Sequence, residues 1–330
     1  MRRGTLAPPT LEEIRAAARR IHAVAIRTPL IPLGVDGPCR IWLKLENLQP
    51  IGSFKVRGAG NAILSTPRES LARGVFTASA GNMAQGIGYC ARRLGVAAAA
   101  VVPDHAPRTK LEALERLSLR VVKVPFDEWW RVITTHDTTG IEGLSEDGGH
   151  PGHFIHPVAD PRVIAGNGTI GLEILEDLPG VDTVVVPYGG GGLVSGIASA
   201  LRSQKPEVKV LACEVETAAP LGASLAAGEP VTVDYIPSFV DGIGGKSVLL
   251  EMWPLVRELV FGSVTVTLRE VAEAIRLLLT RARVLAEGAG AAPVAAALAG
   301  RAGSGDVVCV VSGGNLDLEK LAGILAGTLL

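Results

Sequence analysis

Short apolar runs alternate with amphipathic stretches along most of the chain, and this alternation predicts its secondary structure. The apolar runs are continuous, and they predict strands over residues 41–45, 75–80, 97–102, 121–124, 183–186, 208–214 and 307–311. Continuous runs of this kind are typical of parallel strands that are covered on both faces. The pattern therefore predicts an α/β fold of three layers with mostly parallel, twisted sheets.

Between the strands, the spacing of apolar residues predicts helices over residues 11–25, 82–94, 107–117 and 193–201. The first helix has a start signal, because Thr10 stands three residues before Glu13, which is the spacing of a capping box. Gly95 is a stop signal for the second helix. The segment 137–152 is rich in glycine, threonine, aspartate and histidine and predicts a long surface loop.

Length and composition narrow the classes of protein that remain. A chain of 330 residues suits two domains, or one large α/β unit with an inserted lobe. The formal net charge is −1 and aromatic residues make up 4%, so we expect neither a nucleic acid nor a membrane surface as a partner. The longest apolar stretch, residues 96–103, is far shorter than the roughly 20 residues of a membrane helix.

The N-terminus and the cysteines indicate the compartment. The chain starts Met-Arg-Arg-Gly-Thr-Leu, with charge but no apolar segment, which is not typical of a signal peptide. The cysteines are widely scattered and form no CxxC pair, which favours buried free thiols over disulfides or a zinc site, at Cys39, Cys90, Cys213 and Cys309. We therefore expect a cytoplasmic protein.

Four segments that follow predicted strands carry candidate chemistry. The first runs from Lys44 to Gly58 and contains Gly-Ser-Phe-Lys, in which Lys55 can be held in a tight turn beside an aromatic wall. A partly desolvated lysine has a lowered pKa and becomes an amine nucleophile. Taken alone, however, a lysine is far more often a solvated surface charge.

The other three segments supply hydrogen-bonding groups. Residues 79–86 open a helix and can bind a carboxylate, or form a plain helix cap. Four consecutive glycines, residues 189–192, stand between a strand and a helix. A phosphate without a nucleotide fits this turn best, because it matches neither a P-loop nor a dinucleotide fingerprint; the alternative is a structural turn. Ser312, after the last strand, can meet a ring nitrogen or simply form a turn.

Together these segments resemble the fold-type II pyridoxal-5′-phosphate (PLP) enzymes, and within them the threonine dehydratase/serine racemase group. The most specific motif is Gly-Ser-Phe-Lys-x-Arg-Gly, and the resemblance extends over residues 27–30, 52–58, 156–161, 163–173 and 286–291. It implies PLP as the cofactor, an amino acid as the substrate and a tryptophan synthase β-like fold. The domains we predict are a large PLP-binding domain of residues 1–67 and 160–330 and a smaller inserted α/β domain of residues 68–159.

The resemblance also implies the site residues. Lys55 is the catalytic residue, which holds the cofactor as a Schiff base and later moves the α-proton. The residues implied for cofactor binding are Phe54, Lys55, Asn82, Gly189, Gly190, Gly191, Gly192, Leu193, Glu287 and Ser312. The residues implied for substrate binding, where Ser79 and its loop take the carboxylate, are Ser79, Ala80, Gly81 and Met83.

Within the cofactor set, the resemblance implies individual roles. Phe54 flanks the cofactor, Asn82 hydrogen-bonds the ring oxygen, and Glu287 lies near the ring edge. The glycines and the leucine after them hold the phosphate, and Ser312 faces the pyridine nitrogen. Serine is a weak partner for that nitrogen, and a weaker electron sink favours prompt loss of a β-substituent. The expected reaction is α,β-elimination of water from a β-hydroxy amino acid such as L-threonine or L-serine, which gives a 2-oxo acid and ammonia.

Departures from the group's pattern leave alternatives open. Met83 stands where the group usually has histidine, which allows a bulkier or more apolar β-substituent, as in a phenylserine-type substrate. Ala80 stands where racemase relatives have serine, and Val158 where they have a polar residue. Serine racemase is therefore a weaker alternative, and a β-replacement synthase is weaker still. Trp129 and Trp130 are interpreted as structural rather than substrate-binding.

Three further expectations concern ligands and assembly. We expect no divalent metal, because Pro220 stands where metal-binding relatives have an aspartate, six residues after the position of Glu214, although Glu216 could compensate. The chain ends soon after Ser312, so we expect no regulatory C-terminal domain. The expected assembly is a homodimer or a homotetramer.

Overall fold

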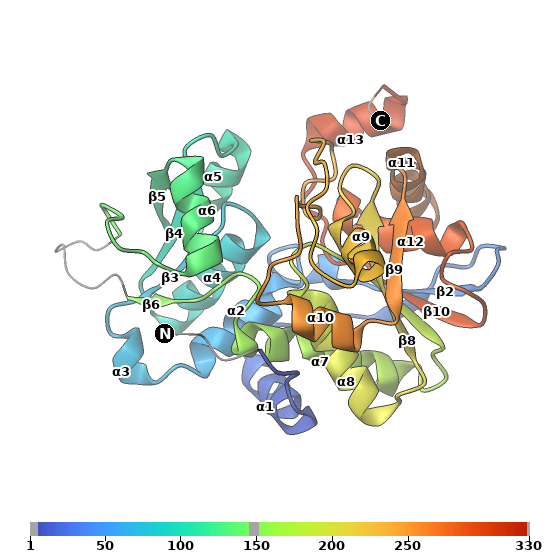
Figure 1. The fold of residues 1–330 in the computed structure, drawn as a ribbon, viewed down its shortest axis with the longest axis horizontal. Coiled ribbons are helices and arrows are strands. Elements are labelled where there is room, and N and C mark those ends of the chain that lie inside the picture. Colours follow the sequence, from blue (N-terminus) through green and yellow to red (C-terminus); the bar gives the residue numbers. More distant parts are fainter. Residues whose placement is uncertain (1–5, 145–151, 329–330) are drawn as a thin grey trace.

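Two twisted sheets organise the chain, each at the centre of its own lobe (Figure 1). The computed structural model describes residues 6–144 and 152–328. The six-stranded sheet has the spatial order β1 (Leu30–Pro32), β2 (Arg40–Lys44), β10 (Asp306–Val310), β7 (Thr183–Pro187), β8 (Lys209–Val215) and β9 (Gly262–Val266). The four-stranded sheet has the order β5 (Arg120–Val124), β4 (Ala98–Pro103), β3 (Val75–Ala78) and β6 (His153–Phe154).

The pairing of the strands agrees with the prediction of mostly parallel sheets. Only β1 is antiparallel to its neighbour among the strands of the described residues. The α/β fold class predicted from the sequence is confirmed. The strands of the small sheet all lie within the predicted insertion of residues 68–159, but the domain boundaries themselves stay a prediction.

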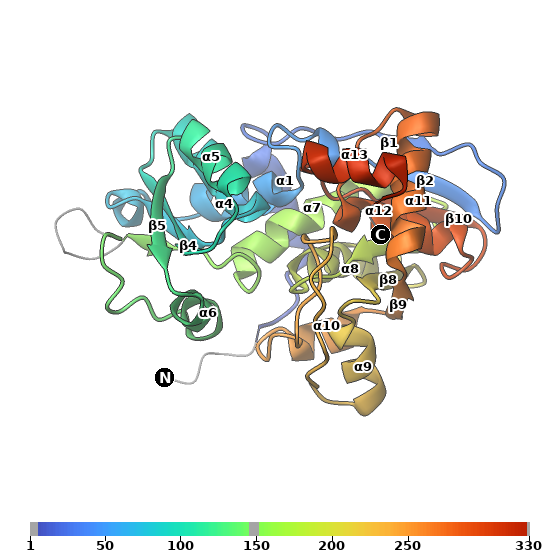
Figure 2. The same cartoon turned by 90° about the horizontal axis from the view of Figure 1, so that it is seen from above.

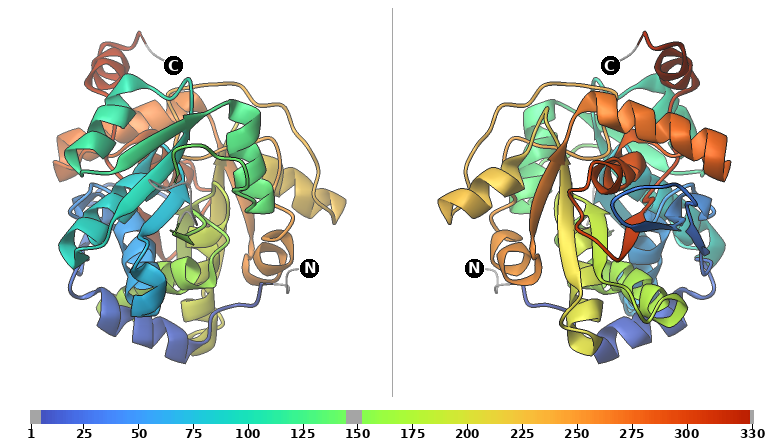
Figure 3. Two further views of the ribbon diagram at one scale, coloured as in Figure 1. Left: turned by 90° about the vertical axis from the view of Figure 1, so that its left-hand side faces the viewer. Right: turned by 90° about the vertical axis from the view of Figure 1, so that its right-hand side faces the viewer.

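Helices cover both faces of each sheet, and Figures 2 and 3 show the two lobes from above and from either end. The helices of the small lobe and its borders are α2 (Lys55–Leu64), α3 (Arg68–Leu71), α4 (Asn82–Leu94), α5 (Arg108–Arg116) and α6 (Phe126–Thr135). Those of the large lobe are α1 (Leu11–Ile21), α7 (Pro161–Asp177), α8 (Gly192–Gln204), α9 (Pro220–Ala227), α10 (Trp253–Leu259), α11 (Leu268–Leu277), α12 (Gly288–Leu298) and α13 (Leu318–Ala326). A 3₁₀ turn, η1 (Glu46–Leu48), and a π-helical turn, η2 (Leu278–Ala282), complete the set.

Burial on both faces explains why the strands are continuously apolar. In the small sheet, Val75 packs with side chains of α2 and α4, whereas the next residue, Phe76, packs with side chains of α6. In the large sheet, Val184 packs with α7 and α8, whereas Val185 packs with α11 and α12. Because successive strand residues point to opposite faces, each strand needs apolar residues at both sets of positions.

Several local predictions have a clear outcome. The capping box of Thr10 and Glu13 forms with both of its hydrogen bonds, and the helix after it ends at Ile21 rather than at residue 25. The helix predicted over residues 82–94 has those bounds, and Gly95 ends it with a φ of 66°. Residues 137–144 lie largely in turns, while 145–151 of the predicted loop lie outside the described residues. No helix within residues 6–144 and 152–328 is both long and apolar enough to cross a membrane.

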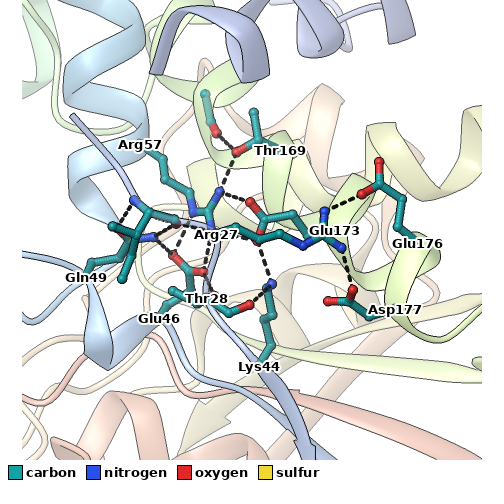
Figure 4. Close-up of polar contacts among 12 residues, drawn as sticks. Arg27, Thr28, Lys44, Glu46, Gln49, Arg57, Thr169, Glu173, Glu176 and Asp177 are labelled. Carbon is teal, nitrogen blue, oxygen red and sulfur yellow. Dashed lines mark hydrogen bonds and ion pairs between the residues drawn. The ribbon is translucent and has the colours of Figure 1, made fainter. Parts of the chain in front are cut away.

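A buried network of four charges fixes the start of α2 (Figure 4). Arg57, which is 1% exposed, donates to both carboxylate oxygens of Glu46 at 2.8 Å and to those of Glu173 at 2.6 and 2.8 Å. Lys44 donates to Glu173 at 2.5 Å and to the carbonyl of Thr28 at 2.7 Å. Two cations therefore face two anions, and the network joins β2, η1 and α7 to the helix that begins at residue 55.

Removing the arginine from this network should be strongly destabilising. In Arg57→Leu, the buried carboxylate of Glu46 and the largely buried one of Glu173 lose their shared partner, and the free energy of unfolding should fall by about 3–5 kcal/mol. The matched control is Arg40→Leu, which removes an exposed bidentate partner of Asp306 and should change stability little. Chemical denaturation of both variants checks this, and similar losses in the two would contradict it.

Candidate functional site

A cavity of about 1100 Å³ brings the predicted site residues together. It is lined by every residue that the sequence indicated for catalysis, cofactor binding or substrate binding. Lys55, Ser312 and Gly189 follow β2, β10 and β7, which are neighbours in the large sheet, and Ser79 follows β3 of the small sheet. The cavity therefore lies beyond the carboxyl ends of parallel strands, where open α/β sheets bind ligands.

The amine of Lys55 lies in this cavity on a partly buried side chain. Its Nζ donates to the carbonyl of Pro157 at 2.8 Å and lies 5.2 Å from the centre of the Phe54 ring. Burial lowers the pKa of Lys55 to about 8. Since the pKa is close to neutrality, a useful fraction of the amine is uncharged, which makes it a competent nucleophile or base.

The four-glycine turn has a shape that side chains would destroy. Gly191 adopts a φ of 97°, which favours glycine. A Cβ atom on Gly190 would lie 2.7 Å from Cγ2 of Val158, and one on Gly192 would lie 2.9 Å from the carbonyl oxygen of Val158. Among the described residues, no side chain caps α8, so the N–H groups of its first turn are available to an anion.

The start of α4 forms a second wall with free backbone donors. No side chain in the described part of the chain caps this helix, and the hydroxyl of Ser79 accepts instead from the N–H of Gly81 at 3.2 Å. Ala80 also lines the cavity at this wall. Met83 also lines the cavity, but its side chain is 2% exposed and packs among apolar residues of α2 and α4. Backbone N–H groups at a helix start suit a carboxylate.

An amide–carboxylate chain connects this wall to the large lobe. Asn82 Nδ2 donates to Glu287 Oε1 at 3.1 Å, and its Oδ1 accepts from Asn315 at 2.8 Å. Burial raises the pKa of Glu287 to about 7, against the opposing effect of the hydrogen bond from Asn82. The carboxyl of Glu287 can therefore hold or release a proton near neutral pH, beside the cavity.

The turn that carries Ser312 is fixed to the turn that carries the lysine. The carbonyl of Ser312 accepts from the N–H of Phe54 at 3.0 Å, and Ser53 forms a β-bridge with Gly313. Ser312 itself is 3% exposed and lines the cavity. Because the backbone links are next to both residues, the positions of Lys55 and Ser312 are coupled.

The structure also places residues at the cavity that the sequence did not assign to the site. Asp241 accepts from Lys110 of α5 at 3.2 Å and from Lys320 of α13 at 3.1 Å, and these helices lie on different lobes at the same side of the molecule (Figure 2). Trp129, interpreted as structural, lines the cavity beside Phe126 and also packs in the small lobe. The glycine-rich run after Asp241 was the available signal for this segment, whereas a single surface lysine gives none.

The carboxylates of Glu214 and Glu216, where we expect no divalent metal, accept hydrogen bonds from groups of the protein itself. The two oxygens of Glu214 accept from the N–H groups of Leu221 and Gly222, each at 2.8 Å, and from the hydroxyl of Ser263 at 2.7 Å. Glu216 accepts from the N–H of Leu268 at 2.8 Å. The absence of a divalent metal stays a prediction. The hydrogen bonds support it, because the oxygens that a metal would need already accept from N–H and hydroxyl groups of the protein.

Comparisons with known proteins agree on one family. The family model described as "Pyridoxal-phosphate dependent enzyme" matches residues 22–313. The L-threonine ammonia-lyase of Thermotoga maritima is 42% identical over 323 residues, which are 96% of this chain and 78% of that protein. The enzyme of the same name from Geobacter sulfurreducens is 40% identical over 322 residues, 96% of this chain and 77% of that protein.

Solved structures of a serine racemase and a threonine deaminase have the same fold as this chain. Maize serine racemase superposes with a TM-score of 0.83 at 30% identity, covering 97% of this chain and 98% of that chain. The processed form of threonine deaminase isoform 2 from Solanum lycopersicum superposes with a TM-score of 0.84 at 32% identity, covering 98% of this chain and 90% of that chain. The overall resemblance predicted from the sequence is therefore confirmed.

The glycine turn should tolerate no methyl group at Gly190, because that methyl would collide with the side chain of Val158. We expect Gly190→Ala to weaken the affinity of the apoprotein for PLP by about tenfold or more, as overpacking displaces the turn. Removing the colliding atoms in the double variant Gly190→Ala/Val158→Ala should restore much of the affinity. Spectrophotometric titration with PLP measures both, and additive losses would contradict the collision argument.

Proposed function

Because the chain belongs to the family of pyridoxal-phosphate dependent enzymes, we propose that it dehydrates and deaminates a β-hydroxy amino acid such as L-threonine or L-serine. The products are a 2-oxo acid and ammonia. The observation that carries this proposal is that one cavity holds the partly buried amine of Lys55, the glycine turn at the start of α8 and the start of α4, and that no described side chain caps either helix. The relatives named L-threonine ammonia-lyase support the reaction class.

The residues present fit PLP by their chemistry. A cofactor with an aldehyde and a phosphate needs an amine and an anion site, and Lys55 and Gly189–Gly192 supply them within one cavity. Phe54, Asn82 and Glu287 are the residues we assign to the ring and its substituents, and Ser312 is the residue we assign to the ring nitrogen. When bound, PLP supplies the electron sink for the negative charge that develops at the substrate's Cα.

Lys55 is the group that we assign to proton transfer at Cα. Its lowered pKa lets the free amine accept the α-proton near neutral pH. The N–H groups at the start of α4 hold the substrate carboxylate, which orients the Cα–H bond toward the amine. Ser312 is uncharged at neutral pH, so it cannot act as a counter-ion that keeps a proton on the ring nitrogen. Prompt loss of the β-hydroxyl is therefore favoured over repeated proton exchange.

A second candidate is a dehydratase for a bulkier, 3-substituted serine of the phenylserine type. The specific observation in its favour is the apolar part of the cavity wall, to which Phe126 and Trp129 contribute. These two side chains offer contact area to an aromatic β-substituent, and neither carries a charge. Met83, on which the sequence argument for this substrate rested, is buried and offers little contact area. Comparing kcat/KM for L-threonine, L-serine and L-threo-phenylserine separates the two candidates.

The assignment of Lys55 is tested by Lys55→Ala. We expect the visible absorbance of the lysine-bound cofactor to disappear, and 2-oxo acid formation to fall by about a hundredfold or more, because general acid–base groups contribute at least this much. The matched control is Lys123→Ala, which removes an exposed lysine of β5 and should leave both signals intact. Full elimination activity in Lys55→Ala would refute the assignment.

The same site should catalyse little racemisation. Racemisation needs an acid or base on each face of the planar intermediate, and the methyl group of Ala80 cannot transfer a proton. Chiral analysis of L-serine recovered at partial conversion should therefore find little D-serine relative to pyruvate. Ala80→Ser should raise the ratio of racemisation to elimination. Formation of D-serine as fast as pyruvate by the unmodified protein would instead favour a serine racemase.

A further inference from the structure

The turn that returns the chain from the small sheet to α7 passes directly against the cofactor site. This turn, residues 156–159, contributes the carbonyl of Pro157, which accepts from Lys55 Nζ at 2.8 Å. It also contributes Val158, whose side chain and carbonyl fill the space beside Gly190 and Gly192. One short segment therefore contacts both the amine and the glycine turn.

A single imidazole holds this turn in shape. The Nδ1 atom of His156 accepts from the N–H of Val158 at 3.1 Å and from the N–H of Ala159 at 2.6 Å. Its Nε2 atom lies 3.0 Å from the carbonyl oxygen of Ile133 in α6. The ring is 2% exposed, so these backbone groups have little access to water as a replacement partner.

The contacts of His156 determine its tautomer. Because Nδ1 accepts two hydrogen bonds, the proton is on Nε2, from which it is donated to the carbonyl of Ile133. The ring stacks on His136 at 4.4 Å between centroids, and Glu251 lies 3.9 Å from Nε2. Burial, and next the neighbouring His136, lower the pKa of His156 to about 4, against the opposing effects of the Ile133 hydrogen bond, Glu251 and Asp160. The ring is therefore neutral at the pH at which Lys55 acts.

The same contacts argue against a metal at this place. His136, His156 and Glu251 have potential ligand atoms within 4.8 Å of one another. However, a neutral His156 has its lone pair on Nδ1, where two N–H groups already occupy it, and a proton on Nε2. A metal would need a lone pair that this ring does not present, so we assign the ring a role in hydrogen bonding.

We propose that His156 is a positioning residue of the cofactor site: its Nδ1 holds the turn 156–159 so that Pro157 and Val158 are correctly placed against Lys55 and the glycines. This inference rests on the cofactor site proposed above. It also connects that site to the small lobe, because the opposite nitrogen of the same ring is bonded to α6. The ring has no direct part in proton transfer.

Two amide variants separate the two functions of the ring. In His156→Asn, the Oδ1 atom takes the place of Nδ1 and can still accept from the turn, but the donor to Ile133 is lost. In His156→Gln, the amide nitrogen reaches toward the place of Nε2 and can still donate to Ile133, but no acceptor faces the turn. His156→Leu removes both functions. The matched control is His153→Asn, on β6, where the ring contacts Arg162 at 2.9 Å and lies outside the turn.

The readout is the dissociation constant of the apoprotein for PLP, measured from the visible absorbance of the lysine-bound form, with inorganic phosphate as a competitor. We expect His156→Asn and His153→Asn to bind PLP within about threefold of the unmodified protein, and His156→Gln and His156→Leu to bind about tenfold or more weakly, since buried N–H groups lose their acceptor. The phosphate affinity should change in the same order, because Val158 supports the glycine turn.

A thermal unfolding midpoint of each apoprotein distinguishes positioning from general support of the fold. The inference would be overturned if the Asn and Gln variants lost PLP affinity equally and lost thermal stability equally as well. Unchanged PLP affinity in the Gln variant would also overturn it. If His156→Leu does not fold, the comparison of PLP affinity between His156→Asn and His156→Gln still tests the inference. The titration needs no amino-acid substrate, so a failure of the proposed reaction would not change its result.

Discussion

The position of the Lys55 amine depends on a constraint that lies outside the cavity, the balance of four largely buried charges around Arg57. A guanidinium that is almost fully buried must have its charge and its N–H groups satisfied, and two carboxylates from η1 and α7 do this with Lys44 as the second cation. Burying ion pairs is unfavourable unless their geometry is good, so the network tolerates few arrangements of α2 against α7. Since α2 begins at Lys55, the same restriction fixes where the amine enters the cavity.

Backbone groups rather than charged side chains form most of the anion sites that we propose. The starts of α4 and α8 both lack a side-chain cap within the described residues, whereas Thr10, Asp160 and Thr267 cap α1, α7 and α11. The starts of α4 and α8 both line the cavity, and their N–H groups stay available for a ligand. A site of the kind we propose would bind a phosphate and a carboxylate without placing a permanent positive charge beside Lys55. Such a charge would lower the pKa of the amine further.

Seven of the ten strands in the described residues, and the turns that line the cavity, could be predicted from the sequence because both have strong local signals. Apolar runs indicated the strands, and the glycine run, the Ser-Ala-Gly-Asn segment and the lysine motif stand directly in the chain. Several helices, among them α2, α7 and α12, could not be predicted in this way. Most of the residues in these three helices are buried, and a helix that is buried on nearly every side lacks the polar face that periodicity detects.

What could not be predicted is how segments that are far apart in the chain support one another at atomic distances. His156 was visible in the sequence as part of a His-Pro motif, but its two hydrogen-bonding directions depend on α6 and on the following turn. The carbonyl of Pro157 is a backbone atom that any residue would supply, and it contacts an amine 102 positions earlier in the chain. Composition and periodicity describe which residues are buried, not which buried donor meets which acceptor. The fold class and the chemical groups of the site therefore follow from local patterns, whereas their mutual positions follow from the packing of two lobes around α2 and the turn 156–159.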